Sequence, residues 1–339
     1  MNNYIIRNEN AMYYECDYSC DNALFLRMGS ESFFITDARY SQEAKELSFG
    51  CEVIESSNLV QSARELMQSA KIKKLVYDPN DFTVSLFKEL KKKSKIDFVA
   101  KKDFSQKKRM IKSDEEIVHI SKAVNLGQHG FDEFARFISN EGIGKTEQYL
   151  QYEAKRILSR HGEIDLSFEP IVAIGENASK PHALVTKKRL QNGELLLVDA
   201  GVKYRRYCSD RTRTVSVNKY FSFEDNQNFG SHIQKAYDAV KRAHDKTIKN
   251  VRSGMRANEV DAIAREEITK AGFGDYFIHS TGHGVGLDIH EYPFISKKSD
   301  TIIKDNMVFT VEPGIYLPGE FGIRLEDMVV MRNSKAEIL

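Results

Sequence analysis

Five polar residues in the second half of the chain most constrain what it can fold into. Four are carboxylates and one is a histidine: Asp199, Asp210, His283, Glu312 and Glu326. Each lies in an apolar or glycine-framed segment, as Asp199 does directly after the run Leu195–Val198. Carboxylates carried to buried strand ends are costly to leave unpaired, and metal ions are among the few partners that can hold several of them together. Oxygen ligands with one imidazole suit manganese, iron(II), cobalt(II) or zinc.

Taken singly, each of these residues has an ordinary structural interpretation. A lone aspartate at a strand end is usually a turn or cap residue, and a histidine between two glycines is more often a hydrogen-bonded loop residue than a ligand. The segment Val311–Gly314 could be no more than a turn. The hypothesis of a metal site therefore depends on all five acceptors in this order.

The spacing of the first two aspartates favours a shared site. If residues 194–217 form an antiparallel pair of strands, Asp199 and Asp210 can face each other, with the turn near Gly201–Lys203. Two catalytic metals lie about 3.5–4 Å apart, and with five protein ligands at least one carboxylate must bridge them. The remaining positions fall to water, which metal binding makes nucleophilic. The sequence therefore predicts a two-metal hydrolase.

The composition excludes several other classes. A chain of 339 residues predicts two domains, and a net charge of +1 gives no reason to expect nucleic acid as a partner. The basic stretch 71–109 is interpreted as a solvated face. No signal peptide or membrane-length apolar run is present, so we expect a cytoplasmic protein. The 4 cysteines are too few and too scattered for a disulfide framework, so we expect free thiols.

The chain divides into two predicted parts with different patterns. Residues 1–109 alternate strand and helix, with strands at 32–37 and 74–78 and a helix at 58–70, which predicts a small α/β domain. Residues 110–339 place strands and helices in separate blocks, which favours an α+β domain. The helices expected there begin at Ser113, through a capping box with Glu116, and cover 145–161, about 226–252 and 257–271; strands are expected within 193–217 and 278–332.

Several of these segments also resemble one known family. The matching stretches are 195–201, 209–214, 279–291, 310–316 and 322–326, together with 34–40 and 109–117. They are similar to the pita-bread metallopeptidases, in the branch of Xaa-Pro aminopeptidases and Xaa-Pro dipeptidases. The resemblance runs from about residue 30 to residue 330. It implies an N-terminal creatinase-like α/β domain at 1–109 and a pita-bread catalytic domain at 110–339.

The resemblance implies a role for each of the five acceptors. Asp199 would hold one metal ion, Asp210 and Glu326 would bridge two ions, and His283 and Glu312 would complete the other. Glu312 would also accept the proton of the attacking water. The resemblance therefore implies two divalent metal ions per chain. Manganese is the expected metal, and cobalt, zinc and iron(II) are the alternatives.

Further residues match positions of the family outside the metal ligands. His182 matches a histidine that assists proton movement or substrate binding, and His279 and His290 match two that line the substrate cleft, His290 with a catalytic role. Arg324 resembles an arginine that orients the carboxylates, and Tyr316 a tyrosine near the leaving group. Thr212 is similar to a threonine that supports the carboxylates.

The implied reaction is hydrolysis, by a metal-bridging hydroxide, of the bond between an N-terminal residue and a following proline. The implied partners are peptides with proline second, and a homodimer is expected. An Xaa-Pro dipeptidase (prolidase) is the alternative. Some of these dipeptidases carry an arginine where this chain has Phe294, after His290–Pro293, so we expect an Xaa-Pro aminopeptidase, although Lys297 or Lys298 could substitute. A metal-free creatinase-type hydrolase and a non-catalytic binding module are remote alternatives, disfavoured by the full ligand set.

Overall fold

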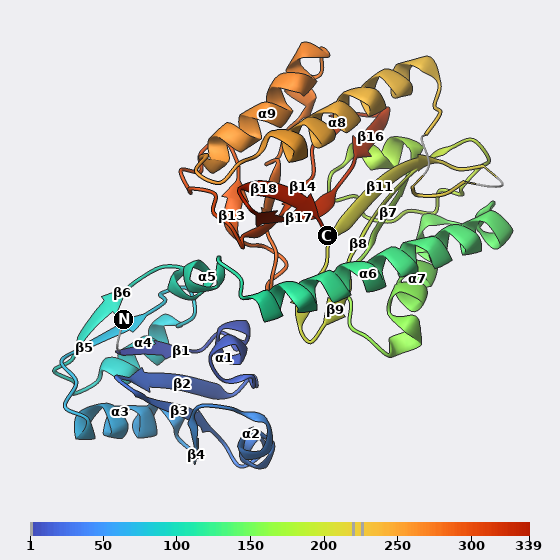
Figure 1. Ribbon diagram of the computed structural model, residues 1–339. Helices are drawn as coiled ribbons and strands as arrows, with labels where there is room; N and C mark the ends of the chain where they lie inside the picture. Colours follow the sequence, from blue (N-terminus) through green and yellow to red (C-terminus); the bar gives the residue numbers. More distant parts are fainter. Residues whose placement is uncertain (1–2, 219–220, 225–226) are drawn as a thin grey trace. The chain divides into compact units, whose positions relative to one another are not determined.

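The computed structural model describes residues 3–218, 221–224 and 227–339. The chain divides into two compact units, Met1–Arg109 and Met110–Leu339 (Figure 1). Of the helices in the described residues, none has both the length and the apolar character needed to cross a membrane.

The first unit is a six-stranded mixed sheet flanked by helices. The sheet has the order β4-β3-β2-β1-β5-β6, in which β1, β2 and β3 are antiparallel neighbours and the outer pairs are parallel. Its strands are β1 Asn3–Ile6, β2 Ala23–Met28, β3 Glu31–Thr36, β4 Glu52–Glu55, β5 Lys74–Tyr77 and β6 Asp97–Ala100. Its helices are α1 Glu9–Cys16, α2 Ser41–Leu47, α3 Leu59–Ser69, α4 Val84–Lys91 and α5 Phe104–Arg109.

Helix α3 illustrates why these segments fold as they do. Its buried residues Val60, Ala63 and Met67 recur at helical spacing, so one face packs on the sheet. Asn58 caps its first turn by accepting a hydrogen bond from the backbone of Gln61. The predicted strands at 32–37 and 74–78 and the predicted helix at 58–70 are therefore found within a residue or so of their expected bounds.

Four long helices cover the second unit. They are α6 Asp114–Phe137, α7 Glu147–Leu158, α8 Ser231–Asn250 and α9 Ala257–Lys270. Helix α6 begins with the predicted capping box, in which Ser113 and Glu116 each accept a hydrogen bond from the other's backbone N–H, at 3.1 and 2.8 Å. The predicted start of α8 at residue 226 lies outside the described residues.

The sheets of the second unit carry the segments singled out in the sequence. Three strands form the sheet β11-β8-β7 and five form β13-β12-β14-β17-β18, with two smaller pairs, β10-β9 and β15-β16. Their bounds are β7 Ile171–Ile174, β8 Leu195–Ala200, β9 Lys203–Tyr204, β10 Tyr207–Cys208, β11 Arg211–Ser216, β12 Gly282–Gly284, β13 Glu291–Ile295, β14 Val308–Val311, β15 Gly314–Leu317, β16 Phe321–Arg324, β17 Asp327–Arg332 and β18 Lys335–Ile338.

One predicted turn is placed differently in the structure. Strands β8 and β11 are antiparallel, as expected, but the connection between them holds its own small hairpin, β9-β10. The reversal therefore occurs at Arg205 and Arg206, both with positive φ (46° and 66°), and not at Gly201–Lys203. Gly201 is needed for another reason, because a side chain there would collide with the backbone carbonyl of Ser209.

Candidate metal centre and active site

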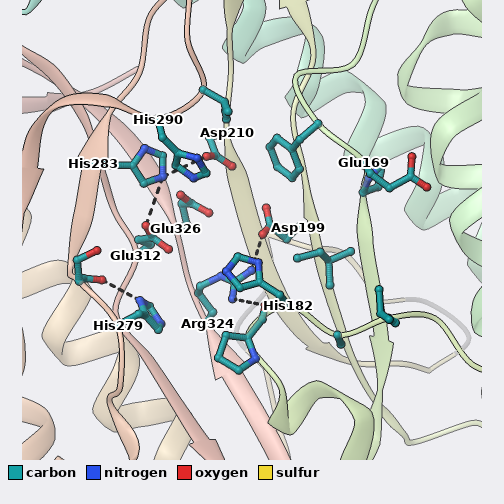
Figure 2. Close-up of a pocket in the computed structure, with 18 of the residues that line it drawn as sticks. Glu169, His182, Asp199, Asp210, His279, His283, His290, Glu312, Arg324 and Glu326 are labelled. Carbon is teal, nitrogen blue, oxygen red and sulfur yellow. Dashed lines mark hydrogen bonds and ion pairs between the residues drawn. The ribbon is translucent and has the colours of Figure 1, made fainter. Parts of the chain in front are cut away.

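A cavity of about 630 Å³ in the second unit collects nearly all the residues singled out in the sequence (Figure 2). The ones that line it are His182, Asp199, Asp210, His279, His283, His290, Phe294, Glu312, Arg324 and Glu326. Tyr316 is not among the lining residues; its side chain is 2% exposed and lies behind His279 and Arg324, to which it is hydrogen-bonded.

The strand pair β8-β11 brings Asp199 and Asp210 to the cavity. Every residue of β8 is buried, so the strand carries Asp199 into the protein interior. The register places Asp199 opposite Thr212, and Asp210 directly precedes β11. The two aspartates thus lie near one end of the pair without being direct cross-strand partners.

The second group of acceptors comes from the five-stranded sheet and its neighbour. His283 is the middle residue of β12, Glu312 directly follows β14, and Glu326 lies between β16 and β17. A side chain at Gly282 or Gly284 would collide with the backbone of the adjacent strands. The glycines beside His283 are therefore required for close strand packing.

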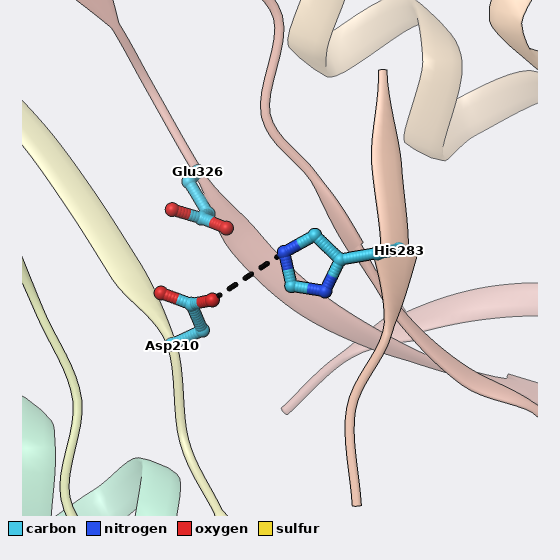
Figure 3. A group of neighbouring side chains, drawn as sticks. All are labelled: Asp210, His283 and Glu326. Carbon is cyan, nitrogen blue, oxygen red and sulfur yellow. Dashed lines mark ion pairs between the residues drawn. The ribbon is translucent and has the colours of Figure 1, made fainter. Parts of the chain in front are cut away.

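Three of the five acceptors form a compact cluster. Asp210, His283 and Glu326 are buried, and each offers a ligand atom within 4.8 Å of the others (Figure 3). The Nε2 atom of His283 lies 3.6 Å from Asp210 Oδ2 and 3.4 Å from Glu312 Oε1, so Glu312 adjoins the cluster through His283. Asp199 is held instead by an ion pair with Arg324.

The carboxylates of this cluster are poorly compensated by protein groups. Burial, followed by the proximity of other carboxylates, raises the pKa of Asp210 and of Glu326 well above the usual range. Burial also raises the pKa of Glu312 to about 7. Within the described part of the chain, Asp199 Oδ1 and Glu326 Oε1 are buried without a hydrogen-bond partner. Divalent cations would compensate these charges and fill these acceptors, so the residues fit a metal site.

His283 has the form that metal binding requires. Burial lowers its pKa to about 3, so the imidazole is neutral near pH 7. Its Nδ1 atom lies 3.1 Å from the carbonyl oxygen of Gly284. A proton on Nδ1 would be donated to that oxygen, which leaves the lone pair of Nε2 directed at Asp210 and Glu312.

Arg324 connects several parts of the site. Its guanidinium pairs with Asp199, donates from Nε to Thr212 Oγ1 at 3.0 Å, and donates from NH1 to Tyr316 Oη at 2.8 Å. The Thr212 hydroxyl in turn donates to Glu326 Oε2 at 2.6 Å. Arg324 is therefore hydrogen-bonded, directly or through Thr212, to the carboxylate of Asp199 on β8 and to that of Glu326 between β16 and β17.

Two further histidines lie close to this network. His279 Nε2 is 3.0 Å from the hydroxyl of Tyr316, and burial, followed by the charge of Arg324, lowers the pKa of His279 to about 3. The ring of His290 packs edge-on against that of His283, with 4.2 Å between centroids. Burial also lowers the pKa of His290. Neutral imidazoles beside the carboxylate cluster can accept a proton from a bound substrate or donate one to it.

The sequence did not predict a group of charged residues that contact the backbone of Glu326 or the residue after it. Arg213 donates to the backbone carbonyl of Glu326 at 2.6 Å and pairs with Asp327 at 2.7 Å. His244 of helix α8 contacts the other oxygen of Asp327 at 3.2 Å. The sequence contained one local indication of this group, because Asp327 directly follows Glu326. His244 lies more than 80 positions away, so no local pattern connects it to them.

Another part of the cavity wall was also not foreseen. It is largely apolar, and its residues include Phe168, Pro170, Ile171, Leu184 and Val185. These residues lie before β7, at its start and in the segment that follows it. Nothing in their local pattern distinguishes a cavity wall from ordinary packing.

Comparison with known proteins gives consistent matches. The profile of metallopeptidase family M24 matches residues 118–333. An uncharacterized peptidase of Bacillus subtilis, YqhT, is 32% identical over 332 residues, covering 97% of this chain and 91% of that protein. The Xaa-Pro dipeptidase of Pyrococcus furiosus is 36% identical over 256 residues, covering 75% of this chain and 70% of that protein.

Solved structures agree over the whole chain. An Xaa-Pro dipeptidase from Bacillus anthracis superposes with a TM-score of 0.91 at 29% identity, covering 99% of this chain and 92% of that chain. An X-Pro aminopeptidase from Thermotoga maritima superposes with a TM-score of 0.87 at 29% identity, covering 100% of this chain and 95% of that chain.

Proposed function

Because the chain belongs to metallopeptidase family M24, with a pita-bread catalytic fold, we propose that it is a dinuclear-metal exopeptidase that cleaves Xaa-Pro bonds. The observation that carries the proposal is the buried cluster of Asp210, His283 and Glu326, with Glu312 beside it, in a cavity large enough for a short peptide. In the first place we propose Xaa-Pro dipeptides as substrates, since this is the activity named for the P. furiosus and B. anthracis relatives.

In this proposal five residues would hold the metal ions: Asp199, Asp210, His283, Glu312 and Glu326. The ions would supply Lewis-acid chemistry, polarising the scissile carbonyl and acidifying water. Glu312, half-buried beside His283, would take a proton from the attacking water. Arg324 would keep Asp199 and, through Thr212, Glu326 in position.

The histidines of the cavity would act on the substrate. His182 and His290 would hold or move protons at the scissile bond, and His279 with Tyr316 would support the leaving group. The preference for proline has a physical basis, because an Xaa-Pro bond lacks an N–H and carries a rigid ring. A site that acts on the carbonyl does not need that N–H, and the largely apolar wall can contact the ring.

An Xaa-Pro aminopeptidase is the second candidate, and one observation favours it. Phe294 lines the cavity, and its side chain is 36% exposed. Among the described residues that line the cavity, Arg324 is the only one with a permanently cationic side chain. Arg324 is already paired with Asp199. The carboxylate of a bound dipeptide would therefore find no uncommitted Lys or Arg in the cavity, whereas that of a longer peptide could extend into water.

A substrate comparison tests both candidates. The purified protein is incubated with matched Xaa-Pro and Xaa-Pro-Yaa peptides, with and without manganese, and with Xaa-Ala peptides as controls. We expect release of the N-terminal residue from proline peptides, loss of activity with a chelator and recovery with manganese. Cleavage of Xaa-Ala as fast as Xaa-Pro would refute the proline specificity, and the ratio of kcat/KM between the two proline series decides between the candidates. The proposed homodimer is tested by light scattering of the same preparation.

A further inference from the structure

The carboxylate of Glu147 is fully buried and accepts an unusual number of hydrogen bonds. Glu147 is 0% exposed and is the first residue of α7. Its oxygens accept from the backbone N–H of Ile174 at 2.7 Å, from Asn177 Nδ2 at 2.9 Å, and from both the backbone N–H and the hydroxyl of Thr186 at 2.6 Å. An ionised carboxylate only accepts, so four donors around it form a matched site for this charge.

These donors flank one chain segment, 175–185, or lie inside it. Ile174, the last residue of strand β7, directly precedes the segment, and Thr186 directly follows it. Inside the segment, Asn177 also donates to the carbonyl of Leu184 at 3.0 Å. The Glu147 carboxylate therefore closes the base of a loop, which we call the 175–185 loop, by binding both of its ends.

The 175–185 loop carries part of the cavity wall. Its residues Pro181, His182, Ala183, Leu184 and Val185 all line the cavity (Figure 2). The loop also contacts the site directly, since Arg324 donates to the carbonyl of Pro181 at 3.3 Å. The position of His182 thus depends on a loop whose base is fixed by a side chain from another element.

We propose that Glu147 is a positioning residue for this peptidase, whose buried carboxylate fixes the 175–185 loop and thereby places His182 at the substrate. The proposal deepens the proposed function, on which the role of His182 rests. Glu147 itself does not line the cavity, so its effect on the reaction passes through the loop. A misplacement of about 1 Å at a reacting group can cost as much as 10²-fold in rate.

The test uses Glu147→Gln with Glu153→Gln as a matched control. Glutamine keeps the shape of the side chain but replaces one acceptor oxygen with an NH₂ donor, so at least one of the four donors loses its partner. Glu153 lies on the same helix, is 6% exposed and pairs with Arg156 three residues along. Both variants remove one buried carboxylate from α7, but the Glu153 carboxylate pairs within the helix.

The first measurement is amide hydrogen exchange without substrate. In Glu147→Gln we expect faster exchange of peptides that cover Ile174 to Thr186, with wild-type exchange in Glu153→Gln. This readout does not depend on activity, so it stands even if the protein cleaves no Xaa-Pro peptide. Exchange in Glu147→Gln that equals the wild type would overturn the proposal.

The second measurement is a double-mutant cycle with His182→Ala on kcat/KM for an Xaa-Pro substrate. We expect Glu147→Gln to lower kcat/KM by about 10- to 100-fold in the wild-type background and by less than about twofold in the His182→Ala background. Metal content should stay at the wild-type level. Losses that multiply independently in the double variant would show that Glu147 does not act through His182, and would overturn the proposal. If wild-type protein cleaves no proline peptide, the proposed function fails while the exchange result still decides the role of Glu147 in the loop.

Discussion

Lys112 and Glu291 form an ion pair that is shut off from water, although they are 179 positions apart in the chain. Their side chains are 1% and 0% exposed. Lys112 precedes the capping box of α6, and Glu291 directly follows His290 at the start of β13. A side chain at Gly286 would meet both groups, so this glycine makes room for the pair. The pair therefore ties the entry of α6 to the segment that carries His290.

Breaking this pair should destabilise the second unit strongly. Lys112→Met leaves the Glu291 carboxylate buried without its cation, and removal of one partner of a buried pair costs about 3–5 kcal/mol. The double variant Lys112→Met/Glu291→Leu should be more stable than Lys112→Met, since no isolated charge remains. Urea unfolding monitored by circular dichroism gives the free energies.

The exposed pair Lys241–Asp245 serves as the control for that series. Its side chains are 44% and 55% exposed on helix α8. Lys241→Met should change the unfolding free energy by no more than about 0.5 kcal/mol. Equal effects of Lys112→Met and Lys241→Met would contradict the importance assigned to burial.

Replacing Asp210 or Glu326 with alanine should abolish activity and lower metal content together. Each carboxylate belongs to the buried cluster and is proposed to serve both ions. Metal per chain is measured by plasma mass spectrometry after dialysis. Glu169→Ala is the control, because Glu169 lines the same cavity but is not a member of the cluster. A variant at either cluster position that keeps two metals and full turnover would rule out the bridging role.

Replacing Phe294 with arginine should shift preference toward dipeptides. The new guanidinium would offer the dipeptide carboxylate a partner at the cavity wall, where Phe294 offers none. A charge-assisted contact contributes about 1.5–3 kcal/mol, so the ratio of kcat/KM for Xaa-Pro over Xaa-Pro-Yaa should rise roughly tenfold or more. Phe294→Leu separates loss of the ring from gain of charge and should leave the ratio close to that of the wild type. An unchanged ratio in Phe294→Arg would place the dipeptide carboxylate elsewhere.

Cys51 should react with iodoacetamide at a lower pH than an ordinary thiol. It is half-buried, and hydrogen bonds from the Cys16 thiol and from Ser48 lower its pKa to about 7. Its alkylation rate should rise with pH around a midpoint near that value, because the thiolate is the nucleophile. Cys16→Ala removes the main donor, so the midpoint should move up toward the pKa of an ordinary thiol.

Cys208 provides an internal reference in the same experiment. It is buried, and burial raises its pKa to about 11. Peptide mapping by mass spectrometry should therefore show Cys51 alkylated at neutral pH while Cys208 is not. Alkylation of Cys51 with the same pH midpoint in wild type and Cys16→Ala would exclude the thiol–thiol hydrogen bond as the cause.

Local sequence signals were sufficient for most of the predicted helices and strands, and they indicated a metal-dependent hydrolase. The capping box at Ser113, the helical spacing in α3 and the apolar run of β8 depend on neighbours a few positions apart, so they can be recognised in one dimension. The resemblance of short motifs added the proposed ligand set, and the structure brings those residues to one cavity.

The tertiary structure alone decided which charged groups meet. Nothing near Glu147 indicates that its carboxylate will bind both ends of the 175–185 loop, and nothing near Lys112 indicates Glu291 as its partner. The same holds for Tyr316, whose hydroxyl lies behind the cavity wall on His279 and Arg324. A buried charge or hydroxyl needs a hydrogen-bond partner, and it pairs with whichever donor or acceptor the packing brings within reach. Which partner that is depends on the fold as a whole, not on the local sequence pattern.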